Sequence, residues 1–415
     1  MGRGKTCEIW ASDYSSMPEE REDVAYINRL FRETCPLLTC LLDPYKGRTI
    51  RVTSNVQPGQ ILYAGGYLNA VCEAPTNPVF SKLVDLKAKL QFEPIWYWCA
   101  LNSFTKADAL ESADLATISS EAQQQFLMLY RPDKIEPSES VALLAQHLFL
   151  SDDQALKLEH LLQTWKYNCF EHSDDPLGFS AYFLPSFLSH SCAPNAIWFE
   201  SPAEGFVVRA RRSIQAGDEI TISYIPENHL CRDSSERRKF LESTKNFKCE
   251  CERCTEGYDE GDEGVVECRS LLDDIERENR NLITRKEFEI LNRGIRKLDP
   301  HHWMRAECYS LFVDYELARK DVEAAEDFAE RRVRIFEKIL GKEAVNAAFA
   351  WAREELADVR AGRLLRSHDH GTNLHEDKVA LVIKLYEQAA RDLELMFGSR
   401  NEYVVGIRDK ISKLM

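Results

Sequence analysis

The chain has 415 residues, of which 44% are hydrophobic and 29% are charged, and its formal net charge is −15. This length predicts two or three domains with ample chain for a buried core, and the composition is typical of a globular protein. The negative charge argues against broad binding of nucleic-acid phosphates and favours basic partners, such as a lysine-rich protein segment. No window has the roughly 18 apolar residues that span a bilayer, and no apolar signal core begins the chain. We therefore expect a cytoplasmic or nuclear protein.

Residues 1–45 are expected to form an N-terminal helical segment. Apolar residues at helical spacing predict an amphipathic helix between Glu19 and Leu42, namely Val24, Ile27, Leu30 and Phe31. The first six residues, Met-Gly-Arg-Gly-Lys-Thr, also fit the minimal N-myristoylation pattern, which is short enough to arise by chance.

The next two stretches differ in their periodicity. In residues 46–80, Ile50 and Val52 alternate with polar residues and Pro58-Gly59 is typical of a turn, which predicts strands. In residues 81–166, leucines recur at helical intervals, which predicts a helical insertion. The aromatic run Trp96-Tyr97-Trp98 is expected to pack in the core of this insertion rather than to bind a ligand.

The stretch from Ser186 to Cys254 contains most of the residues that could carry chemistry. It ends in Cys249-Glu-Cys-Glu-Arg-Cys254, which offers three thiolates in one loop, whereas zinc usually takes four tetrahedral N or S ligands. Cys192, beside the turn residues Pro194-Asn195, is the candidate for the fourth ligand, so that the metal would join two distant pieces of chain. Unpaired reduced thiols are the alternative. Thirteen cysteines, an odd number, fit reduced thiols plus one metal cluster better than a disulfide framework.

The C-terminal third is predicted to be helical. Residues 255–264 are acidic and glycine-rich, which is typical of a linker. Within residues 265–415, two similar segments, 334–341 and 391–398, each end at a glycine suited to cap a helix. Helix pairs that recur in this way favour a stack like that of tetratricopeptide (TPR) repeats.

Several of these motifs together resemble the second half of a SET domain, as found in the SMYD (SET and MYND domain) family of protein-lysine methyltransferases. The matching pieces follow one another in the family's order: Gly178 with Tyr182, the run Ser189–Asn195, Gly217–Tyr224, Ser235–Arg238 and the cysteine triplet. The resemblance implies an α+β fold, in which residues 46–80 and 167–242 form a β-rich SET domain around the helical insertion 81–166. A post-SET zinc segment at 243–254, the acidic linker at 255–264 and an all-α TPR-like domain at 265–415 would follow.

The family's MYND zinc module is not expected in this chain. That module needs a dense array of cysteine and histidine, and only Cys99, His147 and His160 occur between residues 73 and 165. Without the module, no nucleic-acid binding is expected.

The resemblance implies transfer of a methyl group from S-adenosylmethionine to a lysine amine of a protein substrate. A free lysine has a pKa of about 10.4, so the site must take the amine out of water, neutralise it and align it. Tyr224, in the family's tyrosine position, would be catalytic. The residues implied to bind the cofactor are Lys46, Arg48, Asn168, Ser186, Phe187, Ser189, His190, Tyr224 and Phe247. The implied zinc ligands are Cys192, Cys249, Cys251 and Cys254, and the C-terminal helices could bind a protein partner.

Three residues depart from the family pattern. Thr49 stands where a glycine lets the backbone approach the cofactor, and Ser189 replaces an asparagine. Lys245 stands where the family carries a second active-site tyrosine, and a cation there would disfavour both a sulfonium and a protonated lysine, unless Lys245 itself is neutral. Two alternatives to the enzyme therefore stay open: a non-catalytic scaffold with the same fold, and a pocket adapted to another small molecule.

Overall fold

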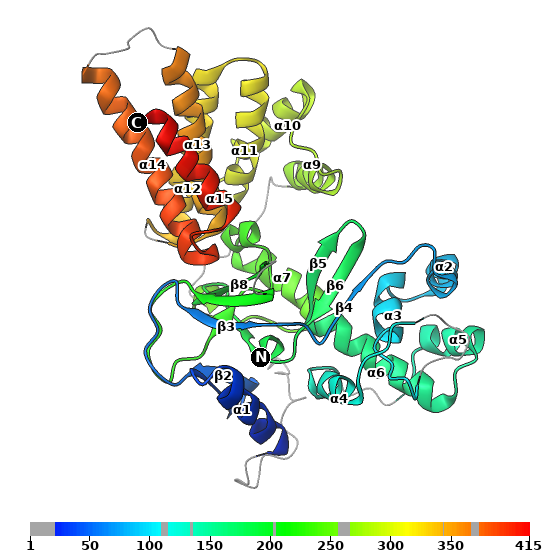
Figure 1. Ribbon diagram of the computed structural model, residues 1–415. Coiled ribbons are helices and arrows are strands. Elements are labelled where there is room, and N and C mark those ends of the chain that lie inside the picture. The colour runs from blue at the N-terminus through cyan, green and yellow to red at the C-terminus, as the bar shows by residue number, and fades with distance from the viewer. Residues whose placement is uncertain are drawn as a thin grey trace, which may run out of the picture.

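A computed structural model describes residues 21–108, 115–132, 136–201, 205–255, 266–342, 344–366 and 373–415. Figure 1 shows two lobes: a mixed α/β lobe that runs to residue 255, called the N-terminal lobe here, and a helical lobe formed by residues 266–415. The myristoylation pattern at residues 1–6 and nearly all of the predicted acidic linker lie outside the described residues. None of the described helices has the length and apolar content needed to cross a membrane.

The N-terminal lobe begins with a helix and a hairpin, and here the predicted helix was too long. Helix α1 covers Glu22–Thr34, and Cys35 is its C-cap. Pro36 follows directly, and the residue before a proline is disfavoured in the helical conformation. Strand β1 (Leu38–Asp43) then pairs antiparallel with β2 (Gly47–Val52). Residues 38–42, predicted to continue the helix, are therefore part of a hairpin.

Two three-stranded sheets and a short parallel pair form the β part of this lobe. The strand orders are β3 (Ile61–Gly65), β9 (Gly205–Ala210) and β8 (Ala196–Ser201) in one sheet, and β4 (Asn69–Cys72), β6 (Leu177–Ala181) and β5 (Cys169–Asp174) in the other. The parallel pair joins β7 (Ser189–His190) to β10 (Thr221–Ile222). Strand β10 ends at Ile222, and Tyr224 lies beyond its end.

The segment between β4 and β5 is helical, as predicted. Its helices are α2 (Pro78–Asp85), the short 3₁₀ helix η1 (Lys87–Lys89), α3 (Pro94–Leu101), α4 (Ser120–Met128), α5 (Glu139–Leu148) and α6 (Asp152–Asn168). Tyr97 and Trp98 are buried, and the ring of Trp96 stacks on Phe179 at a centroid distance of 4.4 Å. The aromatic run is therefore part of the core. Helix α6 ends at Asn168, directly before β5, and so brings its last residues to the β part of the lobe.

Three short 3₁₀ or α elements and one long helix complete the N-terminal lobe. They are η2 (Pro185–Phe187), η3 (Glu227–Cys231), α7 (Ser234–Lys245) and α8 (Glu252–Thr255). The side chain of Asp233 accepts from the backbone N–H of Glu236 and so caps the N-terminus of α7. The helix ends after Lys245, where Asn246 takes a left-handed conformation with φ of 59° and turns the chain toward the cysteine loop.

The helical lobe consists of α9 (Val266–Arg277), α10 (Arg285–Ile295), α11 (Trp303–Ala318), α12 (Val322–Leu340), α13 (Ala347–Arg366), α14 (Asn373–Phe397) and α15 (Glu402–Leu414). Consecutive helices pack against one another. Gly341 and Gly398 follow α12 and α14 with positive φ, as predicted for helix caps. The lobes touch where α14 packs on β9 and the rings of Phe199 and Phe397 meet edge to face.

Candidate functional site

Four cysteines converge at the boundary between β7 and the loop after α7. The thiol sulfurs of Cys192, Cys249, Cys251 and Cys254 all lie within 4.8 Å of one another. The Sγ of Cys192 is 3.5 Å from that of Cys254 and 4.0 Å from that of Cys249. Tetrahedral zinc with Zn–S bonds of about 2.3 Å places its sulfurs about 3.8 Å apart. The quartet therefore fits one structural zinc ion. Its four cysteines are the zinc ligands that were predicted from the sequence.

Hydrogen-bond donors surround the sulfurs. The backbone N–H of Cys192 points at the Sγ of Cys251 (3.4 Å), and the guanidinium of Arg237 at the Sγ of Cys254 (3.5 Å). The Arg253 guanidinium donates to the carbonyl of Cys192 at 3.0 Å. Such donors offset the negative charge of four thiolates and hold the ligands in place. Arg237 lies in one of the motifs that match the family, but the contacts of Arg237 and Arg253 could not be predicted from the sequence, because they depend on where α7 and α8 lie.

Tyr224 is connected to the cysteine quartet through His190. The backbone N–H of Tyr224 donates to Nδ1 of His190 at 3.0 Å, and Nε2 of the same ring lies 3.3 Å from the Sγ of Cys192. Because Nδ1 is an acceptor, the proton of the neutral ring belongs on Nε2, which then donates to the sulfur. Burial lowers the pKa of His190 to about 4, which keeps the ring neutral near pH 7. The imidazole thus fixes the backbone at Tyr224, two residues after β10.

The side chain of Tyr224 lies in a small aromatic group. Its hydroxyl donates to the carbonyl of Leu188, and burial raises its pKa, so it is a neutral phenol. The ring centroids of His190 and Phe247 lie 5.3 and 6.3 Å from that of Tyr224. Phe247 is two residues before Cys249, so the quartet positions it. The structure therefore brings together three of the residues predicted for the site.

Lys245 reaches the same group. Its Nζ lies 5.9 Å from the centroid of the Tyr224 ring and donates to the carbonyl of Tyr167 at 3.3 Å. Lys245 is the last residue of α7, and Tyr167 belongs to the last turn of α6. Lys245, which departs from the family pattern, therefore lies beside the Tyr224 ring.

Two other residues predicted to bind a cofactor have side chains engaged elsewhere. The Arg48 guanidinium lies 4.6 Å from the ring centroid of Phe187 and pairs with Asp23 of α1 at 3.3 Å. The ammonium of Lys46 pairs with Glu219 at 2.6 Å. A cofactor contact from this strand would therefore use its backbone. The Arg48–Asp23 pair could not be predicted from the sequence, because it depends on where α1 packs.

Thr49 is fully buried, and its hydroxyl donates to the carbonyl of Leu41 at 3.4 Å within the β1–β2 hairpin. The hairpin thus accommodates the threonine that replaces the family's glycine.

The remaining predicted residues are Asn168, at the end of α6, and members of the segment 186–190. The amide nitrogen of Asn168 donates to the carbonyls of Tyr130 and Thr164, both at 2.7 Å. The Ser186 hydroxyl donates to the carbonyl of Tyr182 at 2.6 Å, and Ser189 pairs with Thr221 in the β7–β10 ladder. Segment 186–190 therefore runs from the Arg48–Phe187 stack to the Tyr224 group. The cofactor roles of these residues stay predictions.

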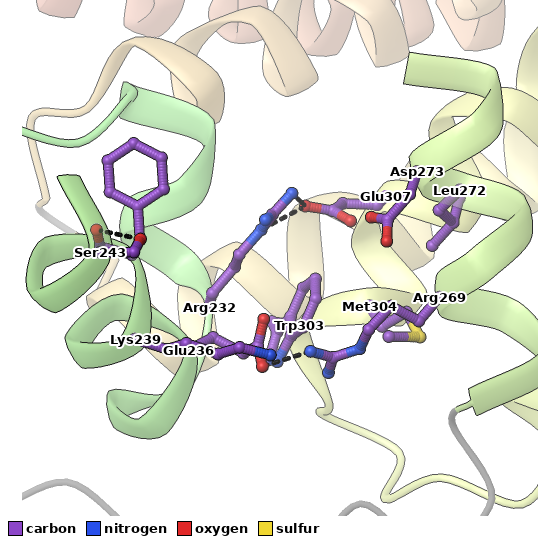
Figure 2. Close-up of a pocket in the computed structure, with 11 residues that line it drawn as sticks. Arg232, Glu236, Lys239, Ser243, Arg269, Leu272, Asp273, Trp303, Met304 and Glu307 are labelled. Carbon is purple, nitrogen blue, oxygen red and sulfur yellow. Dashed lines mark hydrogen bonds and ion pairs between the residues drawn. The ribbon is translucent and has the colours of Figure 1, made fainter. Parts of the chain in front are cut away.

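A separate cavity of about 240 Å³ lies between the lobes, lined by α7, α9 and α11. Figure 2 shows Trp303 between the guanidinium groups of Arg232 and Arg269, whose carbons lie 5.1 and 5.8 Å from its ring centroid. Arg269 pairs with Glu236 across the lobes, and Arg232 pairs with Glu307 at 3.1 Å. Both contacts cross between the lobes and so connect them.

The comparisons with known proteins identify the N-terminal lobe. Residues 47–225 match the family model described as "SET domain". A mouse protein named histone-lysine N-methyltransferase SMYD3 is 42% identical over 79 residues, which is 19% of this chain and 17% of the relative. A *Drosophila melanogaster* protein named SET domain-containing protein SmydA-8, isoform A, is 31% identical over 111 residues, or 26% of this chain and 23% of the relative. Residues 47–225 therefore match a SET domain, and proteins named SMYD3 and SmydA-8 are among the relatives of this chain.

Beyond the SET domain the likeness is limited. The aligned segments span only 17% and 23% of these two relatives. Among solved structures, one titled as the SET domain of LSMT bound to lysine and AdoHcy covers 96% of this chain and 93% of its own. It has 10% sequence identity and a TM-score of 0.34. The *Neurospora* SET domain protein DIM-5, titled a histone lysine methyltransferase, has 16% identity and a TM-score of 0.19, with 48% of this chain and 56% of that chain covered.

Proposed function

We propose that this chain is an S-adenosylmethionine-dependent protein-lysine N-methyltransferase with a structural zinc ion. The observation that carries the proposal is the chain of contacts from Tyr224 through His190 to Cys192. It holds the neutral phenol of Tyr224 beside β7 and the loop that carries Phe247, which the metal would join. A relative named histone-lysine N-methyltransferase SMYD3 supports the same reaction.

The residues around segment 186–190 fit a cofactor that combines an aromatic base with a charged tail. Phe247 offers a ring face held by the cysteine loop, and His190 and Phe187 add rings on either end of the segment. Bound S-adenosylmethionine would supply a methyl group activated by a sulfonium. The resemblance assigns Phe247 to the adenine.

Tyr224 would position the acceptor amine. The lysine ammonium must first lose a proton to water, and its nitrogen lone pair then forms the new N–C bond as the C–S bond breaks. A buried phenol can hydrogen-bond near the reacting atoms, yet it carries no negative charge that would hold the amine in its protonated form. The raised pKa of Tyr224, caused by burial, supports this neutral role.

Zinc in this scheme has a structural role. All four ligand positions belong to cysteines, so no position is left for water or substrate. The ion would join β7 to the loop that carries Phe247. The substrate would be a protein with a target lysine in a basic segment, in keeping with the chain's net charge of −15. The helical lobe is a candidate surface for a further protein partner.

The proposal is tested by replacing Tyr224 with phenylalanine. Removing the hydroxyl should lower turnover on a lysine-bearing substrate about 100-fold. The affinity for S-adenosylmethionine, measured by calorimetry, should fall far less than turnover. Unchanged turnover would exclude this role for Tyr224.

A non-catalytic scaffold is the second candidate function. It is favoured by Lys245, whose ammonium stands beside the Tyr224 ring. A scaffold would keep the fold and the zinc ion and would not bind S-adenosylmethionine, so a binding measurement separates the two candidates without knowledge of the substrate.

A further inference from the structure

We propose that Lys245 is a specificity-determining residue that controls the charge state of what the Tyr224 site binds, by favouring a neutral amine over an ammonium. This inference rests on the proposed methyltransferase function and assigns a role to a residue that departs from the family pattern. The geometry carries it, because the lysine ends at the aromatic ring that would position the acceptor.

The position of Lys245 is defined by the packing of two helices. The left-handed Asn246 ends α7 directly after it, and the side chain crosses to the last turn of α6, where it donates to the carbonyl of Tyr167. Among the described residues, no carboxylate lies within ion-pair distance of its Nζ. Its contacts are a carbonyl and an aromatic ring, neither of which cancels a full positive charge.

The titratable groups around Lys245 include one carboxylate, Glu171, which acts on the Cys169 thiol through space, as Lys245 does, but makes no ion pair with the lysine. Burial raises the pKa values of the thiol of Cys169 and the phenol of Tyr224, so both groups are neutral near pH 7. Lys166 adds a second cation, with its Nζ 5.0 Å from the centroid of the Tyr167 ring. Glu219, the acid that acts on Tyr224 through space, is paired with Lys46.

A cation at this place has two chemical consequences. It lowers the pKa of an incoming lysine ammonium, because like charges disfavour the protonated form, and so it promotes the neutral amine that the reaction needs. It also weakens binding of a sulfonium, which is positive, relative to the thioether product, which is neutral. The same charge thus assists deprotonation of the acceptor lysine. It also makes the site bind cationic S-adenosylmethionine more weakly than the neutral thioether product.

The test removes the charge and keeps an unbranched side chain that is one atom shorter. In Lys245→Met, the ratio of the dissociation constants for S-adenosylmethionine and S-adenosylhomocysteine should fall on the order of fivefold. With a lysine peptide as substrate, the acidic limb of the kcat–pH profile should move about one unit toward higher pH, because the acceptor loses the like charge. A merely structural role for Lys245 would change neither the ratio nor the pH limb.

Two variants provide the controls. Lys245→Arg keeps the charge and should keep the wild-type ratio. Lys239→Met makes the same substitution on the face of α7 that lines the interlobe cavity (Figure 2), away from Tyr224, and should also leave the ratio unchanged. A wild-type ratio in Lys245→Met would overturn the inference while leaving the methyltransferase proposal intact. Failure of the wild-type chain to bind either cofactor form would refute the proposed function, and this inference with it.

Discussion

Replacing Cys192 with serine should detach the loop that carries Phe247 from β7. Cys192 and Cys249 are 57 residues apart in the chain, and the metal would close this segment into a loop. Treated as a cross-link, a loop of that length contributes about 4 kcal/mol by restricting the unfolded chain. The three remaining thiolates belong to one short loop and cannot restore the link.

Hydrogen exchange measures this local loss directly. Because each 1.4 kcal/mol corresponds to a factor of ten, backbone amides of residues 246–255 should exchange about 1,000-fold faster in Cys192→Ser than in the zinc-loaded wild type. Removing the metal from the wild type with a chelator should have a similar effect. The zinc content, determined by mass spectrometry of the metal, should fall below one ion per chain in the variant.

The control is Cys231→Ser. Cys231 is also buried, but it lies outside the quartet and its thiol donates to the carbonyl of Asn228 at 2.7 Å, a bond that serine can keep. Its exchange rates and zinc content should match those of the wild type. Wild-type protection of residues 246–255 in Cys192→Ser would refute the view that Cys192 anchors the loop.

Three further predictions follow from individual contacts. Tyr224→Phe should lower the stability of the chain by only about 1 kcal/mol, the value of one hydrogen bond, while turnover falls about 100-fold. Arg353→Met should lower the melting temperature, since it leaves the buried Asp392 with only the longer ion pair to Arg391 at 3.6 Å, and the cost should approach the roughly 3–5 kcal/mol of a broken buried pair. Arg331→Met, from an exposed pair, should have almost no effect. Glu307→Gln should change the pH dependence of melting. Burial raises the pKa of Glu307 from 4.5 to about 7, so its contribution to stability is present below pH 4.5 and is lost as the pH rises through 7.

The Glu307 measurement compares melting temperatures at pH 5 and pH 8. Arg232, Glu276 and Asp273 face this carboxyl and are the same in both proteins. The variant should lose less stability than the wild type over this interval, because its amide does not titrate. Equal losses would show that Glu307 ionises as readily in the folded chain as in the unfolded one.

The sequence predicted most reliably those features that depend on residues close together in the chain. The spacing Cys-x-Cys-x-x-Cys predicted three ligands, and the turn residues after Cys192 indicated the fourth. The glycines after α12 and α14 predicted where those helices end, because a positive φ at that place suits glycine.

Features that depend on residues far apart in the chain could not be predicted from the sequence. The apolar run after Pro36 continues a helical pattern, and only pairing with β2 makes it a strand. The ion pair of Arg48 with Asp23 and the reach of Lys245 to Tyr167 likewise depend on how α1, α6 and α7 pack. The interlobe cavity around Trp303 could not be predicted from the sequence. Its lining residues come from Arg232 and from α7, α9 and α11, which meet only in the folded chain.

The most direct test of the proposed function is a calorimetric titration of the zinc-loaded chain with S-adenosylmethionine and, separately, S-adenosylhomocysteine. Binding needs no knowledge of the substrate, so an unsuitable peptide cannot affect the result. We expect micromolar dissociation constants, equivalent to about −8 kcal/mol, and a matching rise in melting temperature. Absence of heat at high ligand concentration, together with an unshifted melting curve, would contradict the methyltransferase proposal and favour the scaffold.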